Sequence, residues 1–121
     1  MTVVSTKNAE HYRWNKQCEA WHLLKSPQLS IIQERMPTGC SESKHYHERA
    51  EQFFYVLSGT ASLEISGQTH TLAAQQGIHV RAGIAHRLFN AQPEDLEFLV
   101  VSSPPSHGDR TESPDPEKVN S

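Results

Sequence analysis

Short strand-forming segments, separated by turn residues at intervals of roughly ten residues, constrain the fold of this chain more than any other feature. Each segment is rich in β-branched or aromatic residues, and glycine or proline lies in most of the intervening turns. The expected strands are Leu29–Met36, Gln52–Leu57, Ala61–Ile65, Thr69–Leu72, Ile78–Arg81 and Leu96–Ser102. This pattern predicts an all-β sandwich or barrel.

The hydrophobic pattern of these segments predicts two layers. Leu63 and Ile65 alternate with polar neighbours, which is typical of a strand with one buried face. The segment from Phe53 to Leu57 is apolar on both faces. Such a strand needs cover on both sides, from a second sheet or from another subunit.

The two ends of the chain differ from this central body. Between Lys7 and Lys25, Trp14, Cys18 and Trp21 recur at spacings of four and three that would suit a helical turn. We favour a pair of strands, because the segment leads directly into Ser26-Pro27. Residues 103–121 are polar and proline-rich, which predicts a partly disordered arm. The expected organisation is N-terminal strands packing on the barrel (1–28), the barrel (29–102) and the arm (103–121).

Composition excludes several classes of function. The chain has 121 residues and a net charge of −3, so one domain is expected, with no basic surface for nucleic acid. No apolar run approaches the roughly 20 residues of a membrane span, and the N-terminus lacks a signal-peptide pattern. Two cysteines form no disulfide framework, so the expected location is the cytoplasm.

The eight histidines are the compositional feature that calls for an explanation. His45 and His47 are two residues apart, so their side chains project from the same face of an extended strand. His86 follows the turn at Ala82-Gly83. Two imidazoles from one strand and one from another can ligate a divalent metal in an all-β fold.

Around these histidines the sequence resembles the cupin superfamily, at the level of its small single-domain members. The family's first motif matches Gly39-CSESK-His45-Tyr46-His47-ERAE-Gln52-FFYVLS-Gly59. Its second motif matches Arg81-Ala82-Gly83-Ile84-Ala85-His86-RLF-Asn90, with Arg81 at the position of the family's proline. The resemblance implies a double-stranded β-helix, or jelly-roll barrel, with a metal inside it.

The resemblance implies four metal ligands, of which the fourth has two candidates. Counting back from Gly59 gives Gln52, whereas counting on from His47 gives Glu51. We favour Gln52, with His45, His47 and His86, because the strand that ends at Gly59 fixes the alignment. Glu48 is expected to be a solvated loop residue.

The ligand chemistry suits a divalent transition metal but does not identify it. Three imidazoles and an amide oxygen fit zinc, iron, manganese, nickel or copper. A glutamine ligand would leave the centre more positive than a carboxylate ligand, and so a stronger Lewis acid.

No catalytic residue is assigned from the sequence. Arg81 and His79 are candidates for a second catalytic group, although His79 is expected to have a lining or core role rather than to ligate. The other histidines are expected on the surface or in packing, and Cys40 as a small buried thiol. We expect Glu34 not to line the barrel opposite the metal.

Three functions remain open. The first is a metal-dependent enzyme acting on a small organic substrate, of dioxygenase, isomerase or cyclase type. The second is a non-catalytic module that binds a small acid or sugar, and the third is a structural domain with a vestigial metal site. The resemblance also implies a homodimer that pairs through a sheet edge.

Overall fold

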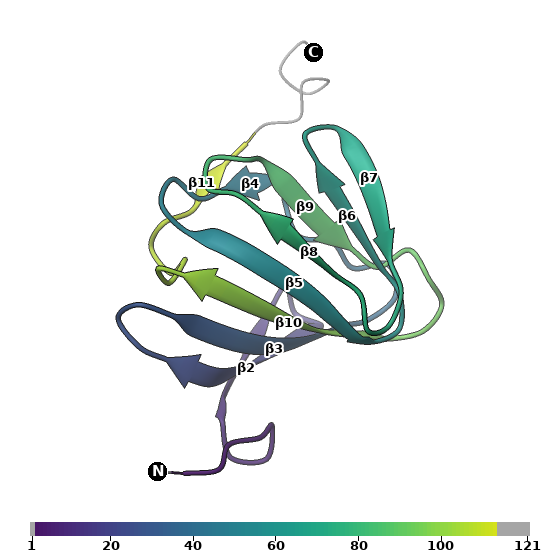
Figure 1. Ribbon diagram of the computed structural model, residues 1–121. Helices are drawn as coiled ribbons and strands as arrows, with labels where there is room; N and C mark the ends of the chain where they lie inside the picture. Colours follow the sequence, from purple (N-terminus) through teal and green to yellow (C-terminus); the bar gives the residue numbers. More distant parts are fainter. Residues whose placement is uncertain (1, 114–121) are drawn as a thin grey trace.

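The computed structural model describes residues 2–113 and contains two antiparallel sheets that face each other (Figure 1). The six-stranded sheet has the order β1-β2-β3-β10-β5-β8. Its strands are β1 (Glu10–Trp14), β2 (Cys18–Lys25), β3 (Ser30–Met36), β10 (Leu96–Ser103), β5 (Glu51–Ser58) and β8 (Gly77–Val80). The five-stranded sheet has the order β11-β4-β9-β6-β7. Its strands are β11 (Thr111–Glu112), β4 (His45–Tyr46), β9 (His86–Phe89), β6 (Ala61–Ile65) and β7 (Gln68–Leu72).

The all-β prediction is confirmed, and all six expected strands are present with ends shifted by one residue or not at all. The N-terminal segment forms the strand pair β1 and β2 rather than a helical turn, and this pair extends the six-stranded sheet. Within residues 2–113, no helix is long and apolar enough to cross a membrane. The short strands β4, β9 and β11 were not among the segments expected from the turn pattern.

The core lies between the two sheets. Phe54, Val56 and Phe98 reach it from the six-stranded sheet, and Leu63 and Leu88 from the five-stranded sheet. All five side chains are almost fully buried. Alternate residues of each strand therefore face one interior, which explains why the apolar positions recur with a period of two.

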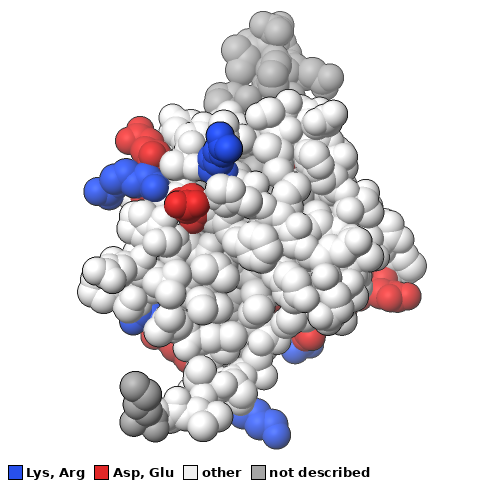
Figure 2. All heavy atoms as spheres, viewed as in Figure 1, with Lys and Arg blue, Asp and Glu red and all other residues white. Residues whose placement is uncertain are grey.

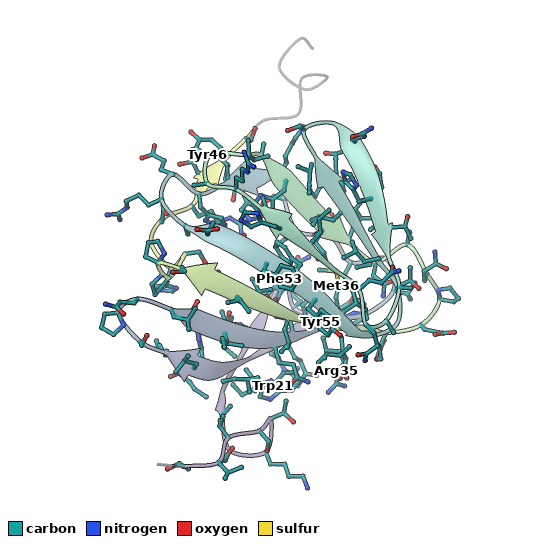
Figure 3. All side chains as sticks on the ribbon, in the orientation of Figure 1. Trp21, Arg35, Met36, Tyr46, Phe53 and Tyr55 are labelled. Carbon is teal, nitrogen blue, oxygen red and sulfur yellow. The ribbon has the colours of Figure 1, made fainter. Side chains whose placement is uncertain are left out.

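The outer face of the six-stranded sheet carries aromatic side chains. Phe53 and Tyr55 of β5 stack with their ring centroids 6.4 Å apart, and the Arg35 guanidinium lies over the Trp21 ring (Figure 3). Phe53 is 41% exposed. In this view the charged side chains lie mostly around the periphery (Figure 2). Other residues of the described chain thus pack against the inner face of β5, whereas its outer face remains partly exposed at Phe53.

Gly59, in the turn between β5 and β6, is required by its backbone conformation and by its surroundings. Its φ is +83°, and a Cβ atom there would lie 2.5 Å from the Asp95 carbonyl oxygen. Gly67, in the turn between β6 and β7, has a similar φ of +81° but open space around it.

Replacing Gly59 with alanine is expected to destabilise the fold more than replacing Gly67. Gly67→Ala should cost about 1–2 kcal/mol for the left-handed conformation alone. Gly59→Ala should cost about 1–3 kcal/mol more, because the methyl group displaces backbone. Urea unfolding of the two variants measures the difference, and equal losses of stability would contradict this account of the turn.

Candidate metal centre

Three histidine side chains meet inside the barrel, and strand pairing brings them together. The antiparallel register of β4 and β9 places His45 directly opposite His86. His47 follows two residues after His45, so its side chain points to the same side of the backbone. One ring nitrogen from each residue lies within 4.8 Å of the others, and all three residues are buried. The three histidines singled out in the sequence therefore form one cluster that can hold a metal ion.

Each imidazole is oriented by a backbone carbonyl that accepts a hydrogen bond from its Nδ1. The acceptors are Ser43 O at 2.8 Å for His45, Asp109 O at 2.5 Å for His47 and Ile84 O at 2.9 Å for His86. Because a carbonyl oxygen only accepts, each Nδ1 carries the hydrogen and each Nε2 keeps a free lone pair. Nε2 of His47 is buried without a hydrogen-bond partner among the described residues.

Gln52 lies beside this cluster with its amide oxygen directed at it. Its Nε2 donates to Ser102 Oγ at 3.0 Å, which leaves Oε1 at 3.1 Å from Nε2 of His86. Both atoms of that second contact are acceptors in this arrangement, so they repel each other unless a cation or a proton lies between them. The pattern of three free imidazole nitrogens and one amide oxygen fits a divalent transition metal.

Burial keeps these imidazoles in the form that binds metal. Burial lowers the pKa of His45 to about 3, although the hydrogen bond to the Ser43 carbonyl acts to raise it. Burial also lowers the pKa of His86 to about 4, and Ile84 opposes it in the same way. At neutral pH both rings are uncharged, and no proton is available to relieve the contact between His86 and Gln52.

The cluster opens onto a cavity of about 820 Å³. His45, His47 and Gln52 form its polar end. Its walls carry both apolar or aromatic and polar side chains. The lining residues include Tyr12, Trp14, His22, Ile32, Glu34, Glu42, Phe54, Val100, His107 and Arg110. A volume of this size is typical of a site for a small organic molecule.

A sequence model for the cupin domain matches residues 32–102, which is more than half of the chain. The chain belongs to the cupin family. Solved structures agree in fold: KdgF from Halomonas sp. superposes with a TM-score of 0.80 at 17% identity, covering 88% of this chain and 98% of that one. The polyketide cyclase RemF from Streptomyces resistomycificus gives 0.76 at 20% identity, covering 87% and 80%. At these identities the likeness establishes the double-stranded β-helix fold alone.

Two curated relatives share part of the sequence. Polyketide synthase CurC of Streptomyces cyaneus is 35% identical over 62 residues, which are 51% of this chain and 40% of CurC. An uncharacterised protein of Streptomyces coelicolor is 34% identical over 82 residues, covering 68% of this chain and 76% of the relative. The match to CurC thus spans less than half of that relative's length.

The other candidate residues of the cupin motifs lie outside the cavity. Glu51 projects from the opposite face of β5 to Gln52, and its Oε1 lies 2.7 Å from Nε2 of His79 in a largely exposed pair. Arg81 is exposed and does not line the cavity, and Glu48 is exposed in the loop after His47. Neither His79 nor Arg81 is therefore placed to act on a molecule held beside the histidines.

The expectation for Glu34 is wrong. Its side chain lines the cavity, in the same phase of β3 as Ser30 and Ile32, which also line it. The alternation of apolar residues in LSIIQERM contained this signal, because Ile32 and Met36 flank Glu34 at a spacing of two. Glu34 thus faces the interior although it is charged, as its position between Ile32 and Met36 indicates.

Sequence reasoning missed Glu42 entirely, although it is the second carboxyl of the cavity. Its backbone lies just before β4, and one of its carboxylate oxygens accepts a hydrogen bond from Leu88 N at 3.0 Å. Burial raises the pKa of Glu42 to about 7, while the Leu88 contact and Arg110 act against the rise. No pattern in the sequence distinguishes Glu42 from the exposed acids of neighbouring loops.

The segment after β10 completes the cavity. Pro105, Ser106, His107, Gly108 and Arg110 line it, and β11 pairs with β4 at the end of the barrel where Tyr46 lies (Figure 3). The first half of the expected arm thus lies against the barrel of its own chain, whereas residues 114–121 lie outside the described residues. His22 and His107, expected in surface or packing positions, also face the cavity.

Asp109 joins this segment to the metal centre. Its carboxylate accepts hydrogen bonds from the backbone N–H groups of Glu48, Arg49 and Ala50, each at 3.0 Å. These contacts, that of Arg49 foremost, lower the pKa of Asp109. Its own carbonyl oxygen accepts the hydrogen of His47 Nδ1. One residue therefore holds both the ring of His47 and the loop that follows it.

Replacing Asp109 with alanine is expected to weaken zinc binding by about tenfold, because loss of support around a metal-binding histidine has effects of this order. Titration of zinc against the metal-free protein measures the change. Asp95→Ala, which removes an exposed aspartate from the turn before β10, is the matched control and should bind zinc as the parent does. Equal affinities of the two variants would show that the carboxylate of Asp109 does not support His47.

Replacing Glu34 with glutamine is expected to stabilise the metal-free protein increasingly as the pH rises. Burial, together with the nearby Glu42, raises the pKa of Glu34 from 4.5 to about 8. The folded parent therefore holds a proton that the unfolded chain releases, and its stability falls between about pH 4.5 and pH 8. Urea unfolding of both proteins across this range measures the gap, which should widen steadily. A gap independent of pH would contradict the raised pKa.

Proposed function

We propose that this cupin is a metal-dependent enzyme of isomerase or cyclase type, acting on a small organic molecule that carries a carbonyl group. The observation that supports this most is the convergence of three free imidazole nitrogens and one amide oxygen at the polar end of a large cavity. His45, His47, His86 and Gln52 would hold the metal. A bound divalent ion would supply Lewis-acid polarisation of a carbonyl oxygen.

The neutral ligand set favours a strongly polarising centre. Three uncharged imidazoles and one uncharged amide leave the full charge of a divalent ion on the site. The acids that line the cavity, Glu34 and Glu42, both have a raised pKa, of about 8 and about 7, so they carry less negative charge near neutral pH than exposed glutamates would. An oxygen-rich substrate would therefore bind with its oxygens towards the histidines.

The walls of the cavity favour an aromatic or polyketo compound as substrate. Trp14, Ile32, Phe54 and Val100 offer apolar surface for a planar carbon skeleton, and Tyr12 adds a ring at the same cavity. The names of two similar proteins point the same way, since CurC is a polyketide synthase and RemF a polyketide cyclase. A sugar phosphate isomerase is also among the similar structures, at 19% identity.

The metal itself is expected to be zinc, iron, manganese or nickel, and its identity separates the chemical alternatives. Zinc would support proton-transfer chemistry, whereas iron, manganese or nickel would direct the proposal towards a dioxygenase. A non-catalytic binding module would use the same centre without turnover.

Elemental analysis of protein purified without an affinity tag or added metal tests the proposed centre. The parent should contain close to one metal ion per chain, and His47→Ala should contain almost none. Gln52→Ala should bind zinc about tenfold or more weakly, whereas Glu51→Ala, its matched control on the opposite face of β5, should equal the parent. A parent that neither retains metal nor binds added zinc would overturn the proposal. Metal binding together with failure to convert any aromatic ketone or polyketo compound would favour the binding module.

We also propose a homodimer. The outer face of the six-stranded sheet offers exposed Phe53 beside Tyr55 and few charges in the view of Figure 2, and β1 is an edge strand of that sheet. Sedimentation of the parent tests the dimer. A protein that sediments as a monomer at all accessible concentrations would exclude it.

A further inference from the structure

Glu34 is an acid in the middle of a sheet, where an apolar residue would be the ordinary choice. It lies on β3, between β2 and β10, and pairs in register with Ala20 on one side and Phe98 on the other. Both of those neighbours are buried core residues. Its carboxyl group faces the cavity that contains the histidines.

This carboxyl has little support from the protein. The indole N–H of Trp14 lies near it and acts to lower its pKa, and this N–H has no other hydrogen-bond partner among the described residues. Glu42 differs, because the Leu88 N–H holds it in place. Glu34 is half-buried at the cavity wall between apolar neighbours, and an acid there costs free energy that an apolar residue would not. Such a perturbed acid in a cavity is a candidate for a functional role.

We propose that Glu34 is the catalytic proton-transfer residue of this site, exchanging a proton with a carbonyl substrate whose oxygen is held at the histidine cluster. This inference rests on the function proposed above. It assigns a role to a residue that neither cupin motif contains.

The proton transfer is balanced within the site. A carboxylate oxygen of Glu34 takes a proton from the carbon next to the substrate carbonyl. The electron pair of that C–H bond becomes the new C=C bond, and the π pair of the C=O bond moves onto the carbonyl oxygen, which becomes the enolate oxygen. Glu34 is then a carboxylic acid and returns the proton to the same or another carbon. Nothing is oxidised or reduced, and no co-reactant is needed.

The surroundings of Glu34 suit this role. Five groups lie around it: Tyr12 and Trp14 of β1, Cys18 of β2, Glu42 before β4, and Arg110 of the C-terminal segment. Burial and Glu42 raise the pKa of Glu34 to about 8, whereas Trp14 and Arg110 act against the rise. Tyr12 stays uncharged, since burial and the nearby acids raise its pKa to about 12. A group that titrates close to neutral pH both accepts and returns a proton efficiently.

Hydrogen exchange into 2′-hydroxyacetophenone tests the proposal. This aromatic ketone can place two oxygens near a metal, and its methyl hydrogens exchange slowly with water. The zinc-loaded parent in deuterated buffer should accelerate deuteration of the methyl group, measured by NMR, above the rate with free zinc. Glu34→Gln should lower that rate by about a hundredfold or more, while its affinities for zinc and for the ketone stay within about threefold of the parent.

Two further variants sharpen the test. Glu97→Gln removes an acid from the adjacent strand β10 that forms an ion pair with Arg35, away from the cavity, and should exchange as the parent does. Glu34→Asp keeps the carboxyl but withdraws it by one methylene, and should retain a reduced rate that still depends on pH. The parent rate should rise with pH up to about 8, and this rise should be absent in Glu34→Gln.

The outcomes separate this inference from the proposed function. If Glu34→Gln binds both ligands and exchanges hydrogen within about threefold of the parent, Glu34 has no catalytic role and the proposed function stands. If the zinc-loaded parent itself neither binds nor deuterates the ketone, both proposals fail for this substrate class.

Thermal unfolding shows whether Glu34→Gln is folded, and we expect a melting temperature at or above that of the parent. If it is not folded, a folded Glu34→Met variant, which lacks the carboxyl, takes its place, and exchange at the parent rate in that variant overturns the inference.

Discussion

The pairing of β10 with both β3 and β5 is the interaction on which the candidate site depends. β10 lies in the middle of the six-stranded sheet and forms a seven-residue register with each neighbour. On the side of β5 this register places Ser102 opposite Gln52, where its hydroxyl turns the amide oxygen towards the histidines. On the side of β3 it places Phe98 opposite Glu34. A slip of one residue would reverse the direction of every side chain on a strand and would remove both groups from the interior.

The interior of the barrel combines apolar packing with polar groups that are satisfied unequally. The three imidazoles are each held at Nδ1 by a carbonyl, and Asp109 extends this support to the loop after His47. Within the described residues, Nε2 of His47 has no hydrogen-bond partner, Nε2 of His86 faces the Gln52 amide oxygen, and the Glu34 carboxyl has the Trp14 N–H nearby. Polar groups without hydrogen bonds destabilise a folded protein when they are removed from water. Here these groups lie at the cavity, where a bound metal and a bound ligand would interact with them. Stability and function therefore make opposite demands on the same few residues.

Much of the fold could be predicted because strands and turns leave local signals. Glycine in the turns and β-branched or aromatic residues in the strands located six strands almost to the residue. The ligand spacing likewise pointed to His45, His47 and His86, which lie together in the structure. The strands β4, β9 and β11 were not among the strands expected from the turn pattern, and β4 and β11 have only two residues each, too few to show a periodicity. Glu34 was misplaced because a charge outweighed the alternation around it, and the role of Asp109 depends on a loop contact across sixty residues of sequence.

The sequence by itself determined the class of the fold and the chemistry of the candidate ligands. Both depend on residue type and on short spacings. In an extended strand, residues two apart project their side chains from the same face, so the spacing alone fixes which side chains lie together. Only the tertiary structure decided what surrounds those ligands. The choice between Gln52 and Glu51 as the side chain next to His86 depends on the face that β5 turns to the core. The closing of the cavity by residues 105–110, and the presence of an unsupported carboxyl within it, arise from contacts between distant segments that no local pattern encodes.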